Sequence, residues 1–182
     1  MRPLILPAMC LLTACSPPAA PDEGPALSFS ADGGTYAWSV ANGSRGALIL
    51  SRQSATEGRP VLVIACDNVR TGGLQARLFK AEPTPTPLTL TAGEAVMTAP
   101  ARPGRVGDQP VLEGEGDLPS GWAAALGAAT MLKLRYGDQG IEVQGPGSER
   151  AAAFGRHCRD LDSRMRRSGH WTPDGMGAKQ AP

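Results

Sequence analysis

The segment TYAWSVANGSRGALIL, residues 35–50, decides the fold class of this chain. Its first half carries a large or branched apolar side chain at every second position, at Tyr36, Trp38 and Val40. Side chains two residues apart lie on the same face of a strand, so this half predicts a strand with one buried face. Asn42-Gly43 then predicts a tight turn, because glycine supplies the positive φ that hairpin turns require. An apolar segment follows at residues 47–50, and the whole stretch therefore predicts a β-hairpin.

Strand patterns continue on both sides of this hairpin. They occupy residues 27–30, 61–65, 74–79, 88–90, 94–98, 131–136 and 141–143, with turn signals between them. The unbroken apolar run at 61–65 predicts the central strand of a sheet. Short strands at close spacing, followed by one late helix, are typical of an antiparallel sheet that packs on itself. The sequence therefore predicts a mainly β domain with one C-terminal helix, built as an antiparallel β-sandwich or barrel-like sheet.

Two segments are expected to lie outside the strands. Gly72-Gly73 is expected to break the chain before the strand at 74–79, because paired glycines are strong turn signals. Residues 99–119 are rich in proline and glycine and poor in large apolar side chains, which predicts a loop.

Helices are predicted in the last third of the chain. Ser120 is a candidate N-cap for a short helix in which Trp122 and Leu126 lie one turn apart. Ser148 is expected to cap the final helix. The apolar stripe of this final helix comprises Ala151, Phe154, Cys158 and Leu161.

Composition limits the class of protein. The chain has 182 residues, the usual length of one domain. Its 18 basic and 17 acidic residues give a net charge of +1, whereas a general nucleic-acid binder needs a basic surface. No apolar run reaches the roughly 18 residues of a spanning helix. We therefore expect a single-domain protein that does not bind nucleic acid.

The first fifteen residues carry a targeting signal. A short apolar stretch follows Arg2 and ends in Leu12-Thr13-Ala14-Cys15. This motif resembles the lipobox of bacterial lipoproteins, in which an aliphatic residue and two small residues precede a cysteine. The resemblance implies that residues 1–14 are a signal peptide and that Cys15 carries diacylglycerol and a further acyl chain such as palmitate. Ser16 replaces the Asp that retains lipoproteins at the inner membrane, so the resemblance favours the periplasmic face of the outer membrane.

The remaining organisation follows from this reading, with ordinary secretion and cleavage elsewhere as the alternative. Residues 15–26 are expected to form a lipidated, proline-rich tether, whose ten residues 16–25 would reach about 33 Å when extended. Residues 27–161 are expected to form the β-rich periplasmic domain. Residues 162–182 are polar, basic and glycine-rich, and we expect a disordered tail.

Of the four cysteines, Cys66 and Cys158 remain once the signal peptide and the lipidated Cys15 are set aside. An even number of cysteines in an exported chain indicates a disulfide. Cys66 ends the most apolar strand and Cys158 lies on the apolar stripe of the last helix, which favours a bridge between them. A catalytic thiol activated by His157 is disfavoured, because adjacent helix residues point about 100° apart.

Residues with catalytic or metal-binding chemistry are few. The chain has two histidines without metal-ligand spacing. Glu113, Glu115 and Asp117 alternate but lack the pattern of a calcium loop, so we expect a solvated acidic loop. We therefore expect no metal, no cofactor and no enzymatic activity.

Two functions remain open. The first is a non-enzymatic, membrane-anchored periplasmic lipoprotein that acts by contact with an envelope protein in assembly, accessory or inhibitory work. The alternative is a binding module for a small apolar ligand, a lipid or a cell-wall fragment. The candidate ligand or partner contacts are the aromatic residues Tyr36, Trp38, Trp122 and Trp171.

Overall fold

The computed structural model describes residues 27–28, 34–53, 58–82 and 85–167. In these ranges the chain forms strands and helices in a mainly β arrangement. The strands are β1 Leu27–Ser28, β2 Thr35–Asn42, β3 Gly46–Arg52, β4 Arg59–Cys66, β5 Thr71–Ala76, β6 Pro87–Ala92, β7 Ala95–Pro100, β8 Arg102–Val106, β9 Gln109–Asp117, β10 Met131–Tyr136 and β11 Gln139–Gln144. The helices are α1 Trp122–Ala128 and α2 Ser148–Arg167.

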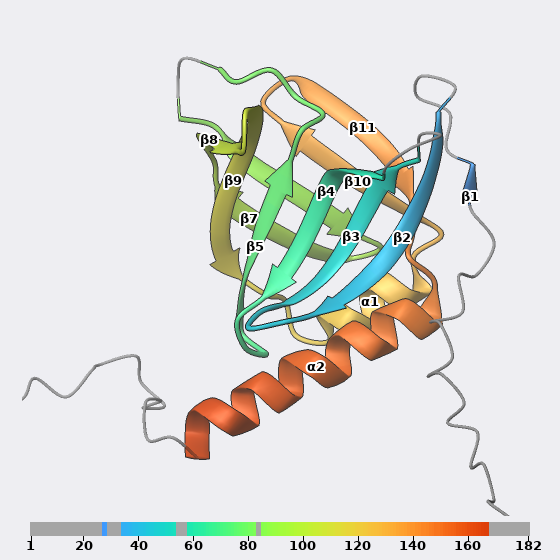
Figure 1. Cartoon of the computed structure of the whole chain (residues 1–182), viewed down its shortest axis with the longest axis vertical. Helices are drawn as coiled ribbons and strands as arrows, with labels where there is room; N and C mark the ends of the chain where they lie inside the picture. The colour runs from blue at the N-terminus through green and yellow to red at the C-terminus, as the bar shows by residue number, and fades with distance from the viewer. Residues whose placement is uncertain (1–26, 29–33, 54–57, 83–84, 168–182) are drawn as a thin grey trace, which may run out of the picture.

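The strands form two antiparallel sheets that face each other (Figure 1). In the part of the chain that the structure describes, the large sheet has the order β1-β2-β3-β4-β5-β9-β8, and the small sheet has the order β11-β10-β6-β7. The chain leaves the large sheet after β5, builds the β6–β7 hairpin, and returns through β8 and β9 before α1. The predicted antiparallel sandwich with a C-terminal helix is confirmed.

The hairpin predicted at residues 35–50 is confirmed. β2 pairs with β3 from Tyr36 opposite Arg52 to Asn42 opposite Gly46. Tyr36 and Trp38 point inward and are buried, as their spacing predicts. The Nε1 of Trp38 donates a 2.8 Å hydrogen bond to the carbonyl oxygen of Gln144, which ties the large sheet to the end of β11.

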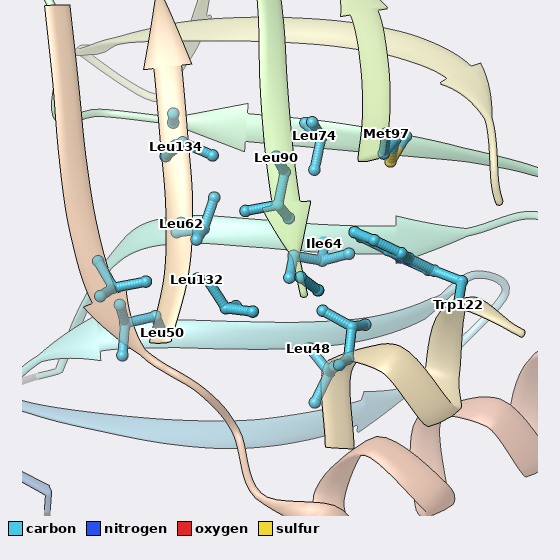
Figure 2. Close-up of a cluster of buried hydrophobic side chains, with 14 of the residues drawn as sticks. Leu48, Leu50, Leu62, Ile64, Leu74, Leu90, Met97, Trp122, Leu132 and Leu134 are labelled. Carbon is cyan, nitrogen blue, oxygen red and sulfur yellow. The ribbon is translucent and has the colours of Figure 1, made fainter. Parts of the chain in front are cut away.

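The core lies between the two sheets (Figure 2). The large sheet contributes Leu48, Leu50, Leu62, Ile64 and Leu74, and the small sheet contributes Leu90, Met97, Leu132 and Leu134. The central position predicted for 61–65 is confirmed, because β4 pairs with both β3 and β5. Only alternate residues of β4 are buried, so this apolar run covers the core with one face and leaves Val61 and Val63 half-buried on the other.

The expectation of a loop at 99–119 is wrong, because most of this segment forms β8 and β9. β9 alternates glycine with acidic residues, and its glycines face the small sheet. A Cβ at Gly114 would lie 2.6 Å from the carbonyl oxygen of Pro100, and a Cβ at Gly116 would collide with the carbonyl oxygen of Thr98. These glycines therefore allow β9 to lie against β7, where the two sheets meet.

The break expected at Gly72-Gly73 is also wrong, because both residues lie within β5 and pair with β4 and β9. A Cβ at Gly72 would collide with the carbonyl oxygen of Ala65 and would contact Leu118. Tertiary packing, rather than a turn, requires glycine here.

The short helix predicted near residue 120 is present as α1, but its N-cap is Gly121 rather than Ser120. Gly121 has φ 71°, a left-handed conformation that favours glycine, and the cap makes no side-chain hydrogen bond. Trp122 and Leu126 are buried one turn apart, as predicted. Figure 1 shows α1 beside α2 at one end of the sandwich.

Helix α2 buries the predicted stripe of Ala151, Phe154, Cys158 and Leu161. The expectation that an irregular tail begins at residue 162 is wrong, because α2 continues to Arg167. Asp162 is buried and its Oδ2 pairs with Arg166 at 2.9 Å, one turn later. Arg164, Arg166 and Arg167 in the last turn complement the helix dipole. The rest of the expected tail lies outside the described residues.

Among the described residues, neither helix has the length and apolar composition needed to span a bilayer. The expected signal peptide, Cys15 and the tether at 15–26 lie outside the described residues.

Candidate functional site

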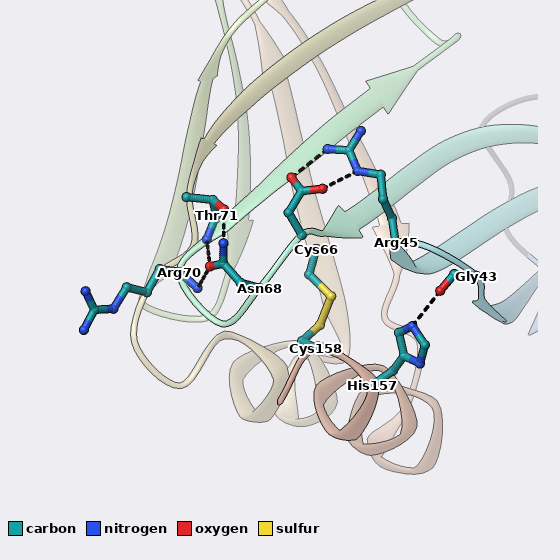
Figure 3. The surroundings of a disulfide bond; sticks show 9 residues. Gly43, Arg45, Cys66, Asn68, Arg70, Thr71, His157 and Cys158 are labelled. Carbon is teal, nitrogen blue, oxygen red and sulfur yellow. Dashed lines mark hydrogen bonds and ion pairs between the residues drawn. A yellow bond between two sulfur atoms is a disulfide. The ribbon is translucent and has the colours of Figure 1, made fainter. Parts of the chain in front are cut away.

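The disulfide predicted between Cys66 and Cys158 is confirmed, and it joins the end of β4 to the middle of α2 (Figure 3). The two Cα atoms lie 5.9 Å apart, and the bridge closes a segment of 92 residues. Cys66 is fully buried and Cys158 is 5% exposed. This burial is typical of a structural disulfide rather than a redox-active one.

Glycines on both neighbouring strands make room for this bridge. Cys66 pairs with Gly46 on β3 and with Gly72 on β5. A Cβ at Gly46 would lie 2.9 Å from the Sγ of Cys66 and 2.8 Å from the ring of His157. The strand ends can therefore approach α2 closely enough for the sulfur atoms to bond.

His157 points away from the sulfur atoms, toward the β2–β3 turn. Its Nε2 lies 3.2 Å from the carbonyl oxygen of Gly43 (Figure 3). This contact fixes the turn against α2, which is a structural role for the histidine.

An ion-pair network lies beside the disulfide, on the outer face of the large sheet. The Arg45 guanidinium makes a two-point contact with the Asp67 carboxylate, with an Nη2 to Oδ2 distance of 2.8 Å. The same Nη2 donates to Oε1 of Glu115 at 3.2 Å. The hydrogen bond to Asp67 is the main cause that raises the pKa of Arg45 above its ordinary value. Arg45 thus joins the β2–β3 turn to the end of β4 and to β9.

The outer face of the large sheet carries a shallow groove of about 510 Å³ next to this network. We call it the outer groove. Small and apolar residues form its floor, among them Ala47, Val63, Ala65 and Gly73. The Arg45 guanidinium also lies over β5, with its Nη2 at van der Waals distance, 3.5 Å, from the position of a Cβ at Gly73.

Charged residues of both signs border the outer groove. Arg45 and Glu115 stand at one end. At the other end, the Nε of Arg102 lies 3.4 Å from Oε1 of Glu113. An apolar centre with a charged border is the usual arrangement of a protein–protein interface.

The candidate aromatic contacts do not assemble into one site. Tyr36, Trp38 and Trp122 are 4%, 5% and 4% exposed. Tyr36 and Trp38, which were expected to contact a ligand or partner, both pack in the core between the two sheets. The Trp122 side chain also enters the core, although the residue borders a smaller pocket beside α1 (Figure 2). Trp171 lies outside the described residues.

A second polar cluster holds the segment before β6 against the β10–β11 hairpin. The Thr86 hydroxyl donates to Oε2 of Glu82 at 3.0 Å, and the Glu82 amide donates to the Tyr136 hydroxyl at 3.1 Å. Gln139 bonds both backbone groups of Lys80. All of these bonds except the one between Thr86 and Glu82 join a side chain to the backbone, which indicates a structural role. Across the described ranges, His, Cys, Asp and Glu form no group of three that could hold a metal ion.

Sequence patterns do not predict the outer groove, although Glu113 and Glu115 on its border carry a signal. The usable signal was the two-residue period of the segment VLEGEGD at 111–117, which places Glu113 and Glu115 on one face and Gly114 and Gly116 on the other. Glycine is also a loop signal, so the same segment predicts a solvated acidic loop.

No protein-family model, curated protein or solved structure matches this chain.

Proposed function

We propose that this protein is a non-enzymatic lipoprotein of the cell envelope, lipid-anchored through Cys15 at the periplasmic face of the outer membrane. It acts by contact with an envelope protein through the outer groove. The observation that carries this proposal is the apolar, uncovered outer face of the large sheet. Figure 1 draws this face without a described helix or strand over it.

The two sheets differ in the chemistry of their outer faces. The small sheet presents mostly polar and charged side chains, including Thr91, Arg135 and the pair of Lys133 and Glu142, whose Nζ and Oε1 lie 3.5 Å apart, together with the exposed but separate apolar residues Val96 and Met131. An exposed face of an antiparallel sheet is normally polar in this way. The large sheet instead presents Ala47, Ile49, Val63 and Ala65. Ala47 lies opposite Ala65 and Ile49 lies opposite Val63, so the large sheet has a continuous apolar area on its outer face, which suits a partner that removes this area from water.

The register of the large sheet organises this face for a partner of defined chemistry. Ile49 lies opposite Val63, Val63 opposite Gln75, and Gln75 opposite Glu113, which in turn lies opposite Arg102. One row of side chains thus passes from apolar through neutral polar to charged. The partner is therefore a protein whose contact surface has an apolar centre surrounded by charged groups of both signs. Its role is one of the assembly, accessory or inhibitory roles considered above.

The proposed anchor rests on the resemblance of Leu12-Thr13-Ala14-Cys15 to a lipobox. A disulfide between Cys66 and Cys158 agrees with an oxidising compartment such as the periplasm. A ligand cavity lined jointly by Tyr36, Trp38 and Trp122 receives less support as the basis of the main function, because Tyr36 and Trp38 belong to the core and do not line the pocket beside Trp122.

Replacement of the anchoring cysteine should remove the lipid. Cells fed an alkyne fatty acid are expected to label the wild-type chain, and Cys15→Ser is expected to abolish the label, because only a thiol at this position forms the thioether. In-gel fluorescence of the immunopurified protein measures the result. Cys10→Ser is the matched control and should keep the label. Label on the Cys15→Ser chain would contradict the proposed anchor.

A charge placed in the outer groove should release the partner. Val63→Arg is expected to shift the detergent-solubilised protein from a larger complex to the size of the free chain, because the guanidinium cannot be desolvated against an apolar surface. Size-exclusion chromatography with immunodetection measures the shift, and circular dichroism checks that the fold is kept. Thr91→Arg makes the equivalent change on the small sheet and should leave the complex intact. Equal profiles for both variants would contradict the contact.

A further inference from the structure

A separate pocket lies between α1, α2 and the turn that joins β4 to β5. We call it the Trp122 pocket. It has a volume of about 260 Å³, and its walls include Leu118, Trp122, Phe154 and Arg159. Val69 stands at this pocket with 39% of its surface exposed, which is unusual for a large apolar side chain in this protein. The pocket is therefore apolar and open at one side.

The Trp122 pocket continues into a groove along the two helices. This groove has a volume of about 530 Å³ and shares Ala123, Ala124, Gly155 and Arg159 with the pocket. Small residues form the floor of this groove because the two helices pack closely. A Cβ at Gly155 would lie only 2.6 Å from the Cβ of Ala123. Helix packing thus explains the small residues of the floor. It does not explain the charges on the border.

Two arginines border this groove on the α2 side. Arg156 and Arg159 are exposed and lie three residues apart, so they stand on neighbouring positions of one helix face. Among the described residues neither forms an ion pair, whereas Arg45, Arg102 and Arg166 each face a carboxylate. None of the described residues that line the pocket or the groove is acidic.

We infer that the Trp122 pocket and its groove bind a single-chain anionic amphiphile of the fatty-acid class. The acyl chain occupies the apolar pocket, and the carboxylate is held by Arg156 and Arg159. A guanidinium offers two parallel donors that match a carboxylate, and two guanidinium groups close together favour an anion between them. The pocket is smaller than the roughly 300–1,000 Å³ of sites for larger ligands, which suits one chain. This inference is independent of the outer groove.

The test measures quenching of tryptophan fluorescence by a medium-chain fatty acid that carries bromine at its methyl end. It uses the chain from residue 16 onward, because detergent or the acyl groups on Cys15 would compete with the probe. Every described element lies within this chain. Trp171→Phe is included as the background substitution, so that the remaining indoles are those of Trp38 and Trp122.

Saturable quenching is expected, and Trp122→Phe should remove most of it. The double variant Arg156→Gln with Arg159→Gln is expected to bind the brominated fatty acid about tenfold or more weakly than the wild type. Its affinity for the acid should then equal its affinity for the matching brominated alcohol, which carries no charge. Lys133→Gln with Arg135→Gln removes the same charge from the small sheet and should leave the affinity unchanged.

Three results would overturn the inference. The first is the absence of saturable quenching. The second is an equal loss in the two double variants, which would indicate non-specific attraction to charge. The third is binding that appears only after deletion of residues 168–182, which would assign the pocket to the chain's own C-terminal segment.

Discussion

Replacement of both Cys66 and Cys158 by serine is expected to lower the free energy of unfolding by about 4.5 kcal/mol. The bridge closes a segment of 92 residues, and in the chain-entropy model a loop of this length restricts the unfolded chain by about that amount. For a folded body of this size the loss corresponds to a decrease in Tm of about 10–20 °C. Urea denaturation followed by circular dichroism measures the change.

The double variant is the appropriate one, because a single substitution would leave an unpaired thiol buried beside a serine hydroxyl. The wild-type chain treated with reductant under mildly denaturing conditions should reach the same midpoint as the double variant. Midpoints that agree between oxidised wild type and the double variant would show that the bridge contributes nothing to stability.

Truncation of the central core residue is expected to have the next largest effect. Leu62→Ala should lower the free energy of unfolding by about 3–4 kcal/mol, because Leu62 is fully buried between the sheets and its truncation leaves a cavity. The neighbouring Val63 is half-buried on the outer face of the same strand. Val63→Ala should therefore cost less than about 1 kcal/mol in the isolated protein.

This pair of variants tests the orientation of β4 directly. Leu62 and Val63 are adjacent in an unbroken apolar run, so composition alone does not distinguish them. Denaturant midpoints measured under identical conditions give the comparison. Similar losses for the two variants would mean that both faces of β4 are covered, which would contradict an open outer face on the large sheet.

Local patterns predicted the elements whose structure depends on neighbouring residues. The hairpin at 35–50 and the β10–β11 hairpin both combine a two-residue apolar period with a glycine-containing turn. The stripe of α2 follows the helical period, which places Cys158 on the buried face of the helix. These features need no knowledge of distant segments.

The remaining features depend on segments that are distant in the sequence. Gly72, Gly114 and Gly116 resemble turn residues locally, but each lies where another backbone or side chain approaches its strand. Glycine is required there by tertiary packing, which single-sequence patterns do not report. For the same reason, the glycine and proline content of residues 99–119 predicts a loop where β8 and β9 form.

The outer groove was missed for a related reason. Arg45 meets Glu115 across 70 residues of sequence, and Ala47, Ala65 and Gly73 become neighbours only through strand pairing. The aromatic residues differ for another reason. The alternation of Tyr36 and Trp38 fits the lining of a ligand cavity as well as a packed core, and the sandwich uses both side chains to fill its interior.

The measurement that tests the contact most directly is site-specific photo-crosslinking in intact cells. A photoreactive amino acid is placed at Gln75, which is half-buried in the outer groove, or at Thr91, which is half-buried on the outer face of the small sheet. A discrete protein adduct is predicted from position 75 and not from position 91. Adducts of equal yield from both positions, or an adduct from position 91 alone, would contradict a partner bound at the large sheet.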